Sequence, residues 1–195
     1  MRIIAGEYRG RRLTAPSGRD TRPTSDRVRE ALFSSLHSRI GSFAELRVLD
    51  AYAGSGALGF EALSRGATHV TAVEHDKGAT RVIQQNLDTL LPEKATPSYR
   101  LIPLDALKAV PLLANAHFDI AFFDPPYGDK SATIYTLLRK LAEAGALAIG
   151  ALVVVERAAS DDGSELWPES FAAQDVKVFG DTSLHFAVYG VGDER

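Results

Sequence analysis

The tetrapeptide Asp124-Pro125-Pro126-Tyr127 directly follows an apolar run over residues 118–123. The run predicts a buried parallel strand, and open α/β sheets place ligands at the carboxyl ends of such strands. Two successive prolines fix φ and remove two backbone donors, which leaves a rigid turn with free carbonyls. The Asp124 carboxylate and the Pro125 carbonyl can then accept both hydrogens of one exocyclic amino group, while Tyr127 stacks on a planar base. The motif indicates a site that holds an aromatic amine for attack on an electrophile. The alternative is a proline-stiffened loop without chemistry.

A glycine-rich turn lies upstream, after an apolar run over residues 46–52. It reads Gly54-Ser55-Gly56-Ala57-Leu58-Gly59 and opens a predicted helix. Glu74 follows about 20 residues after Gly54, where an acid can hold both hydroxyls of a ribose. These two features fit a dinucleotide as well as they fit S-adenosylmethionine.

Acid placement separates the two cofactors. Asp50, Glu74, Asp105 and Asp124 each end one of four predicted strands, and parallel strands bring their carboxyl ends to one rim. A rim of acids disfavours a pyrophosphate and suits a sulfonium, an ammonium group, a ribose and an adenine, with Asp105 placed for the adenine amino group. Two simpler roles stay open: Asp50 can brace the glycine turn, and Asp105 can cap the helix that follows.

Strand and helix patterns alternate along residues 46–190. This alternation predicts a Rossmann-like, doubly wound α/β fold with a mostly parallel seven-stranded sheet that ends in an antiparallel hairpin. The strands are expected at 46–52, 69–74, 99–104, 118–123, 148–156, 171–179 and 183–189, and the helices at 57–65, 77–90, 106–113 and 131–144.

The first 40 residues predict a small hairpin and helix extension. Two short strand-like pieces, Arg2–Ile4 and Arg12–Leu13, precede a helix that Thr24 or Ser25 can cap and that runs to about Ile40. Its buried stripe is expected at Val28, Leu32, Leu36 and Ile40, with Arg27 and Arg29 facing solvent or a ligand.

Composition excludes several classes of protein. The 195 residues contain no cysteine, so disulfides and thiolate metal sites are excluded, and the five histidines have no metal-ligand spacing. No apolar stretch reaches the roughly 18 residues of a membrane helix, and the start of the chain lacks a signal peptide's apolar region. We expect a cytoplasmic protein without a metal.

Positive charge is concentrated at one end of the chain. Residues 1–30 hold eight arginines and four acids, a net charge of +4, whereas the whole chain carries −3 and the remainder therefore −7. Arginine's planar fork suits phosphates and stacks on bases. The asymmetry favours a polyanion partner for this segment, although a solvated basic surface is the simpler interpretation.

With these residues identified, the chain resembles the class I S-adenosylmethionine-dependent methyltransferases and, within them, the RsmD family of bacterial 16S rRNA guanine-N2 methyltransferases. The most specific matching stretch is Arg-Pro-Thr-Ser-Asp-Arg-Val-Arg-Glu-Ala-Leu-Phe at residues 22–33. Further matching segments lie at residues 2–6, 10–13, 53–59, 61–67 and 124–127. Tyr52 and Tyr127 stand where the family commonly has Phe, and both keep an aromatic ring.

The resemblance implies methylation of the 2-amino group of guanine 966 in 16S rRNA, within a partly assembled 30S subunit. A monomer is expected because the sequence has no coiled-coil pattern or large apolar face that argues for an oligomer. It implies a basic RNA-binding extension over residues 1–40 and a methyltransferase domain over 41–195. The expected catalytic residues are Asp124, Pro125 and Tyr127; the expected S-adenosyl-L-methionine contacts are Asp50, Ala53, Gly54, Ser55, Gly56, Gly59, Glu74, His75, Asp105, Ala106 and Asp124; and the expected RNA contacts are Arg9, Arg11, Arg12, Arg22, Arg27 and Arg29.

Three rival functions are weighed against this one. A nicotinamide oxidoreductase has no use for the motif at 124–127, and an idle RNA-binding assembly factor has no use for Asp124. A methyltransferase acting on DNA adenine or on a protein glutamine shares that motif. The arginines favour nucleic acid over protein, and the N-terminal match favours ribosomal RNA over DNA.

Overall fold

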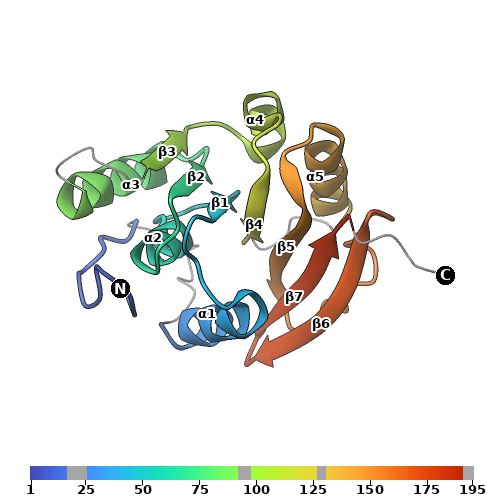
Figure 1. Cartoon of the computed structure of the whole chain (residues 1–195), viewed down its shortest axis with the longest axis horizontal. Coiled ribbons are helices and arrows are strands. Elements are labelled where there is room, and N and C mark those ends of the chain that lie inside the picture. Colours follow the sequence, from blue (N-terminus) through green and yellow to red (C-terminus); the bar gives the residue numbers. More distant parts are fainter. Residues whose placement is uncertain (17–25, 92–97, 127–130, 191–195) are drawn as a thin grey trace. The chain divides into compact units, whose positions relative to one another are not determined.

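Two units, Met1–Asp105 and Ala106–Arg195, divide the chain. The computed structural model describes residues 1–16, 26–91, 98–126 and 131–190. Figure 1 shows the helices and strands in colours that follow the sequence.

The first unit consists of an N-terminal segment and a parallel three-stranded sheet in the order β3-β2-β1. Its elements are α1 (Asp26–Ile40), β1 (Arg47–Asp50), α2 (Ala57–Ser64), β2 (His69–Val73), α3 (Lys77–Leu90) and β3 (Ser98–Ile102). Each parallel pair is joined by a helical crossover, α2 or α3, as parallel pairing requires. Val48 and Leu49 are fully buried, which fits a strand covered on both faces.

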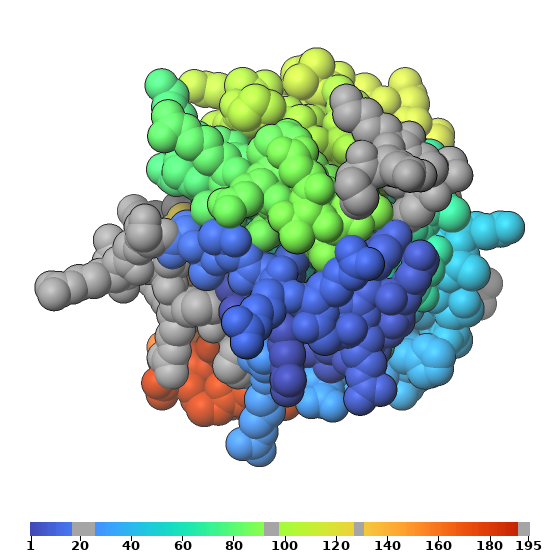
Figure 2. All heavy atoms as spheres, turned by 90° about the vertical axis from the view of Figure 1, so that its left-hand side faces the viewer, coloured from blue at the N-terminus to red at the C-terminus, as the bar shows by residue number. Residues whose placement is uncertain are grey.

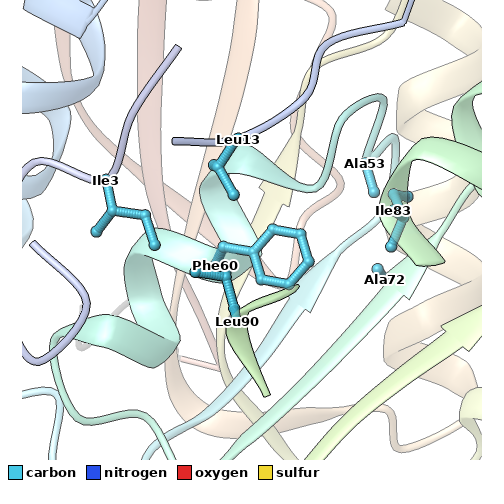
Figure 3. Close-up of a cluster of buried hydrophobic side chains, with 7 residues drawn as sticks. All are labelled: Ile3, Leu13, Ala53, Phe60, Ala72, Ile83 and Leu90. Carbon is cyan, nitrogen blue, oxygen red and sulfur yellow. The ribbon is translucent and has the colours of Figure 1, made fainter. Parts of the chain in front are cut away.

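The N-terminal segment, residues 1–16, is part of the first unit's core. Ile3 and Leu13 pack in one cluster with Phe60, Ile83 and Leu90 (Figure 3). The two predicted strand pieces form only a single antiparallel bridge between Arg2 and Arg12, supported by backbone bonds such as Leu13 N–H to the Met1 carbonyl at 3.1 Å. Residues 1–16 are thus packed on α2 and α3, and the predicted division of the chain at residue 40 stays a prediction.

Helix α1 buries the predicted stripe only in part, because Leu32 and Leu36 are buried whereas Val28 and Ile40 are half-buried. Its buried residues are Arg29, Leu32, Phe33, Ser35 and Leu36. Positions 29, 32, 33 and 36 have the i, i+3, i+4, i+7 spacing of one helix face, with an arginine in the first place. The predicted cap residues Thr24 and Ser25 lie outside the described residues.

The second unit has a four-stranded sheet in the order β4-β5-β7-β6. Its elements are α4 (Ala106–Leu113), β4 (Phe118–Phe123), α5 (Ser131–Glu143), β5 (Leu147–Ala158), β6 (Phe171–Phe179) and β7 (Thr182–Tyr189). β4 and β5 are parallel, whereas β7 runs antiparallel to both β5 and β6. A two-residue turn joins β6 to β7, with Gly180 at φ 61°, the positive value that the first position of a type II′ turn needs.

The predicted order of elements is confirmed, with seven strands in the described residues and the antiparallel hairpin at the end. The main difference is at β5, which begins at Leu147 and carries a register shift against β4 between Phe118 and Ile120. Among the described residues, no helix is both long and apolar enough to cross a bilayer.

Candidate functional site

The glycine turn connects β1 to α2 and is closed by its own backbone. The Gly56 N–H donates to the Ala53 carbonyl at 2.6 Å, and Gly54 and Gly56 have φ of 54° and 78°. A Cβ on Gly56 would lie 2.7 Å from the Phe60 ring and 2.9 Å from the Tyr99 hydroxyl, so a side chain there would clash. A Cβ on Gly54 would meet no atom within 4 Å. The turn therefore packs tightly on one side and is open at Gly54.

Glu74 is hydrogen-bonded to this turn. Its Oε2 accepts from the Gly54 N–H at 2.8 Å, and its Oε1 accepts from the Asp76 N–H at 2.7 Å. The side chain is 10 % exposed. Each carboxylate oxygen has a second lone pair, so two acceptors on a fixed carboxylate remain for a pair of neighbouring hydroxyls. The geometry fits a ribose diol beside a glycine turn that a ligand can approach.

Asp50 supports the glycine motif through a hydrogen bond to its last glycine. It is 1 % exposed, and its Oδ2 accepts from the Gly59 N–H at 3.1 Å. Burial raises the pKa of the nearby Tyr99 phenol well above its usual value, and the Asp50 charge raises it further. Tyr99 stacks on Phe60 with ring centroids 4.7 Å apart. The simpler role kept open for Asp50, bracing the glycine motif, is thus seen directly.

The remaining residues predicted to bind the cofactor differ in exposure. Ser55 is buried, and its Oγ lies 3.4 Å from the Met1 sulfur. His75 is exposed, with Nδ1 3.5 Å from Glu74 Oε1. Asp105 is exposed directly before α4, and Ala106 is buried in the first turn of that helix. Their roles in ligand binding stay predictions.

The amino-group motif follows β4 in the second unit. Phe123, the last residue of β4, is buried and in register with Val155 of β5. Asp124 is half-buried, Pro125 is buried and Pro126 is exposed, all in irregular backbone. The motif thus leaves the carboxyl end of a buried parallel strand, as expected. Tyr127 lies outside the described residues.

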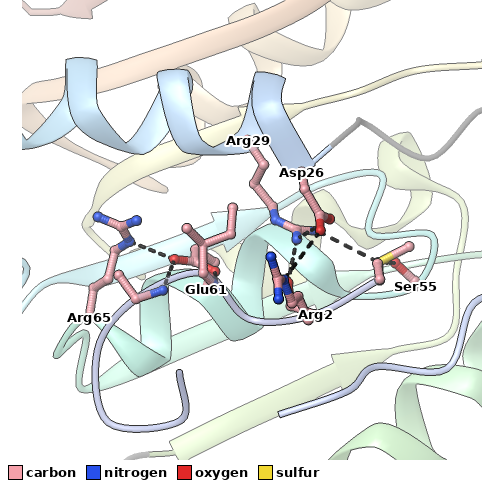
Figure 4. Close-up of polar contacts among 9 residues, drawn as sticks. Arg2, Asp26, Arg29, Ser55, Glu61 and Arg65 are labelled. Carbon is pink, nitrogen blue, oxygen red and sulfur yellow. Dashed lines mark hydrogen bonds and ion pairs between the residues drawn. The ribbon is translucent and has the colours of Figure 1, made fainter. Parts of the chain in front are cut away.

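Arg29 corrects one prediction. Its side chain is fully buried, so it faces neither solvent nor a ligand. Its Nη2 donates to Asp26 Oδ1 at 2.9 Å and to the Arg2 carbonyl, and its Nη1 lies 3.6 Å from the Met1 sulfur (Figure 4). Burial lowers the pKa of this guanidinium, an effect that Asp26 and Glu61 oppose. The two Nη groups of Arg29 thus hold the N-terminal segment on α1.

Glu61 and Ser64 of α2 hold the same segment and were not singled out in the sequence. Glu61 is fully buried and accepts from the backbone N–H groups of Ile4 at 2.8 Å and Ala5 at 3.1 Å. Its third partner is the Arg65 Nε, which donates to Glu61 Oε1 at 2.7 Å (Figure 4). The Ser64 Oγ accepts from the Tyr8 N–H at 2.9 Å. The sequence feature that could have predicted these bonds is the one acid in a mostly apolar helix, because a buried charge needs hydrogen-bond partners.

Four of the arginines predicted to bind RNA have exposed side chains. Arg9, Arg11, Arg12 and Arg27 are exposed, and Figure 2 shows residues 1–16, in dark blue, gathered on one face. The Arg11 guanidinium lies 5.6 Å from the centre of the Tyr8 ring. Arg22 lies outside the described residues.

Comparison with known proteins assigns the family. Residues 1–188 match the family described as "Conserved hypothetical protein 95". The chain belongs to this family. The "Ribosomal RNA small subunit methyltransferase D" of Escherichia coli K12 is 36% identical over 180 residues, which cover 92% of this chain and 85% of that protein. The "Putative rRNA methyltransferase YlbH" of Bacillus subtilis 168 is 40% identical over 141 residues, 71% of this chain and 73% of that one.

Solved structures agree with the fold. The "Putative methyltransferase yhhF from Escherichia coli" superposes with a TM-score of 0.78 at 32% identity and covers 98% of both chains. A magnesium protoporphyrin IX methyltransferase from Synechocystis, at 16% identity and a TM-score of 0.65, shares the fold alone. These findings confirm the resemblance to the RsmD family, the Rossmann-like fold and the assignment as a methyltransferase.

Proposed function

We propose that this protein transfers a methyl group from S-adenosyl-L-methionine to the 2-amino group of a specific guanine, the one conventionally numbered 966, in 16S rRNA. The observation that carries the proposal is the hydrogen bond that holds Glu74 on Gly54 beside an open glycine turn. The chain also belongs to the matching family and has Asp-Pro-Pro-Tyr directly after β4. We further propose that the substrate is the RNA of a partly assembled 30S subunit and that the protein acts as a monomer in the cytoplasm.

Glu74 and the glycine turn hold the cofactor. Glu74 accepts from the two ribose hydroxyls, and Gly54 lets the ligand approach the backbone, since no side chain stands there. Asp50, Ala53, Ser55, Gly56, Gly59, His75, Asp105 and Ala106 complete the proposed cofactor set. When bound, S-adenosylmethionine supplies an electrophilic methyl group on a sulfonium.

Asp124 and Pro125 act on the amino group that receives the methyl. A guanine 2-amino nitrogen is a poor nucleophile because its lone pair is delocalised into the ring. Hydrogen bonds from its two hydrogens to the Asp124 carboxylate and the Pro125 carbonyl favour a pyramidal nitrogen with a localised lone pair. The gain in rate comes from positioning and electrostatics, and Asp124 need not be a strong base because the nitrogen becomes acidic only after transfer.

The exposed arginines contact the RNA backbone. The exposed Arg9, Arg11, Arg12 and Arg27 are proposed for this role, together with Arg22, which lies outside the described residues; Arg29 has no such role because it is buried. The target base must leave its stack to reach Asp124, and Tyr127 is proposed to stack on it. Tyr8 and Arg11 form a cation–π pair on the same surface.

The proposal is tested with tritiated S-adenosylmethionine on 30S subunits from cells that lack this gene. We expect label at one 16S guanine, and its loss in the Asp124→Ala variant. Label on DNA or protein instead would keep the methyltransferase and contradict the ribosomal substrate. Binding of cofactor without transfer to any of these substrates would indicate an idle assembly factor.

A further inference from the structure

Asn86 of α3 joins the N-terminal segment to the glycine turn. Its Oδ1 accepts from the Thr14 N–H at 2.8 Å, and its Nδ2 donates to the Thr14 carbonyl at 3.0 Å and to the Ser55 carbonyl at 3.2 Å. The side chain is 2 % exposed. Both amide hydrogens are therefore used, one geometry is fixed, and no other side chain of this size offers that combination of donors and acceptor.

Residues 1–14 form the N-terminal hairpin, and both of its ends are linked to Ser55 of the glycine turn. Thr14 reaches Ser55 through Asn86, and the Met1 sulfur lies 3.4 Å from Ser55 Oγ. Met1 and Leu13 are themselves paired through the backbone. Since Ser55 stands between Gly54 and Gly56, the hairpin fixes the backbone of the turn that is proposed to receive the cofactor.

Hydrophobic packing of α3 alone does not explain why a polar residue stands at position 86. Asn86 lies on the buried face of α3 with Ala79, Ile83 and Leu90, where an apolar residue would be the simpler choice. A polar residue in such a place is stable only when its groups are hydrogen-bonded, and its partners here are two separate backbone segments.

We propose that Asn86 is a positioning residue that couples the cofactor turn to the hairpin bearing Arg9, Arg11 and Arg12. Ordering of the turn by cofactor then orders the hairpin, and, because coupling between sites is reciprocal, RNA on the hairpin strengthens cofactor binding. This inference rests on the proposed function, since it takes the glycine turn as the cofactor site.

The test is amide hydrogen exchange of the full chain with and without S-adenosylhomocysteine, whose binding is measured by calorimetry. The N–H groups of Ile3, Gly10 and Leu13 report on the hairpin, because they donate within it, and the Gly56 N–H reports on the turn. In the unmodified protein we expect the ligand to slow exchange at both places, by about fivefold or more at the hairpin.

Asn86→Asp has the same size but no amide hydrogens, so the Thr14 and Ser55 carbonyls lose their donor. We expect the ligand still to slow exchange at Gly56 in this variant but no longer at the hairpin. The matched control is Gln85→Ala, an exposed position on the same helix, which should keep the unmodified pattern.

Three results would overturn the coupling. The first is protection of the turn but not of the hairpin in the unmodified protein, which needs no variant to be observed. The second is an unchanged ratio of hairpin exchange rates without and with ligand in Asn86→Asp, which would reduce Asn86 to a purely structural role. The third is no calorimetric binding at all, which would contradict the proposed cofactor site as well as the coupling.

Discussion

Glu74 Oε2 accepts a hydrogen bond from the Gly54 N–H at 2.8 Å, although 20 residues separate the two in the chain. The bond joins the end of β2 to the turn after β1, which are neighbouring parallel strands. It holds the Glu74 carboxylate against the turn, so the acid does not have to be repositioned when a ligand binds.

The Glu74 carboxylate can be tested with Glu74→Gln. The amide has one acceptor oxygen, and its NH₂ group faces either the Gly54 or the Asp76 N–H. We expect S-adenosylhomocysteine binding to weaken by about 1.5–3 kcal/mol, roughly 10- to 150-fold in Kd. Calorimetry measures this, with Gln85→Ala as the control. Equal affinity in the two variants would remove Glu74 from the cofactor site.

Asp124→Asn separates catalysis from cofactor binding. Asparagine keeps one acceptor oxygen but loses the charge that favours a pyramidal amino nitrogen. We expect kcat on 30S subunits to fall by about 10²–10³-fold, the size found when one preorganised polar group is removed, with Kd for S-adenosylhomocysteine changed by less than about threefold. Asp181→Asn, in the exposed β6–β7 turn, is the control. A loss confined to cofactor affinity would refute the catalytic role.

The exposed arginines of the hairpin predict a salt effect. Replacing Arg9, Arg11 and Arg12 by alanine should weaken binding to 30S subunits and reduce the slope of log K against log salt by about 0.7–0.9 for each phosphate that the protein no longer neutralises. Filter binding at several salt concentrations measures the slope. Arg139→Ala, exposed on α5, should leave it unchanged. A slope equal to that of the unmodified protein would place the RNA surface elsewhere.

Arg27 and Arg29 lie two residues apart and should behave in opposite ways. Arg29→Ala removes a buried cation bonded to Asp26 and to the Arg2 carbonyl, and we expect a loss of about 2–3 kcal/mol in the free energy of unfolding by urea. Arg27 is exposed, so Arg27→Ala should change that free energy by about 0.5 kcal/mol or less and weaken RNA binding instead. Similar stability losses in both variants would contradict the assignment.

His185 gives the second unit a dependence on pH. Burial lowers the pKa of this imidazole, while Asp161 partly opposes the effect. The unfolded chain therefore binds the proton more readily, so the associated stability is present above the ordinary histidine pKa, about 6.5, and is lost as the pH falls through the lower folded value. Urea unfolding between pH 7 and pH 5 measures this. His185→Gln should flatten that dependence, and an equally steep loss in the variant would assign it to other groups.

Local patterns in the sequence were enough for the order of the elements and for the place of the candidate site residues along them. Apolar runs such as 118–123 become buried strands because a strand with apolar side chains on both faces must have both faces covered from water. The spacing from Gly54 to Glu74 places the acid at the end of the next strand because one helical crossover separates parallel neighbours. Asp124 and Pro125 follow their strand for the same reason.

Tertiary structure alone decided which polar residues are buried. Arg29, Glu61 and Asn86 each stand on a helix face that could have met water, and their type favours water. Glu61 binds backbone groups 57 and 56 residues away, and Asn86 binds Thr14 from 72 residues away. A charge or an amide is stable inside a protein only where such partners meet it, and a helical periodicity carries no information about partners that distant in the chain. The burial of Arg29 and the link from the N-terminal hairpin to the glycine turn therefore emerged only once these segments were packed together.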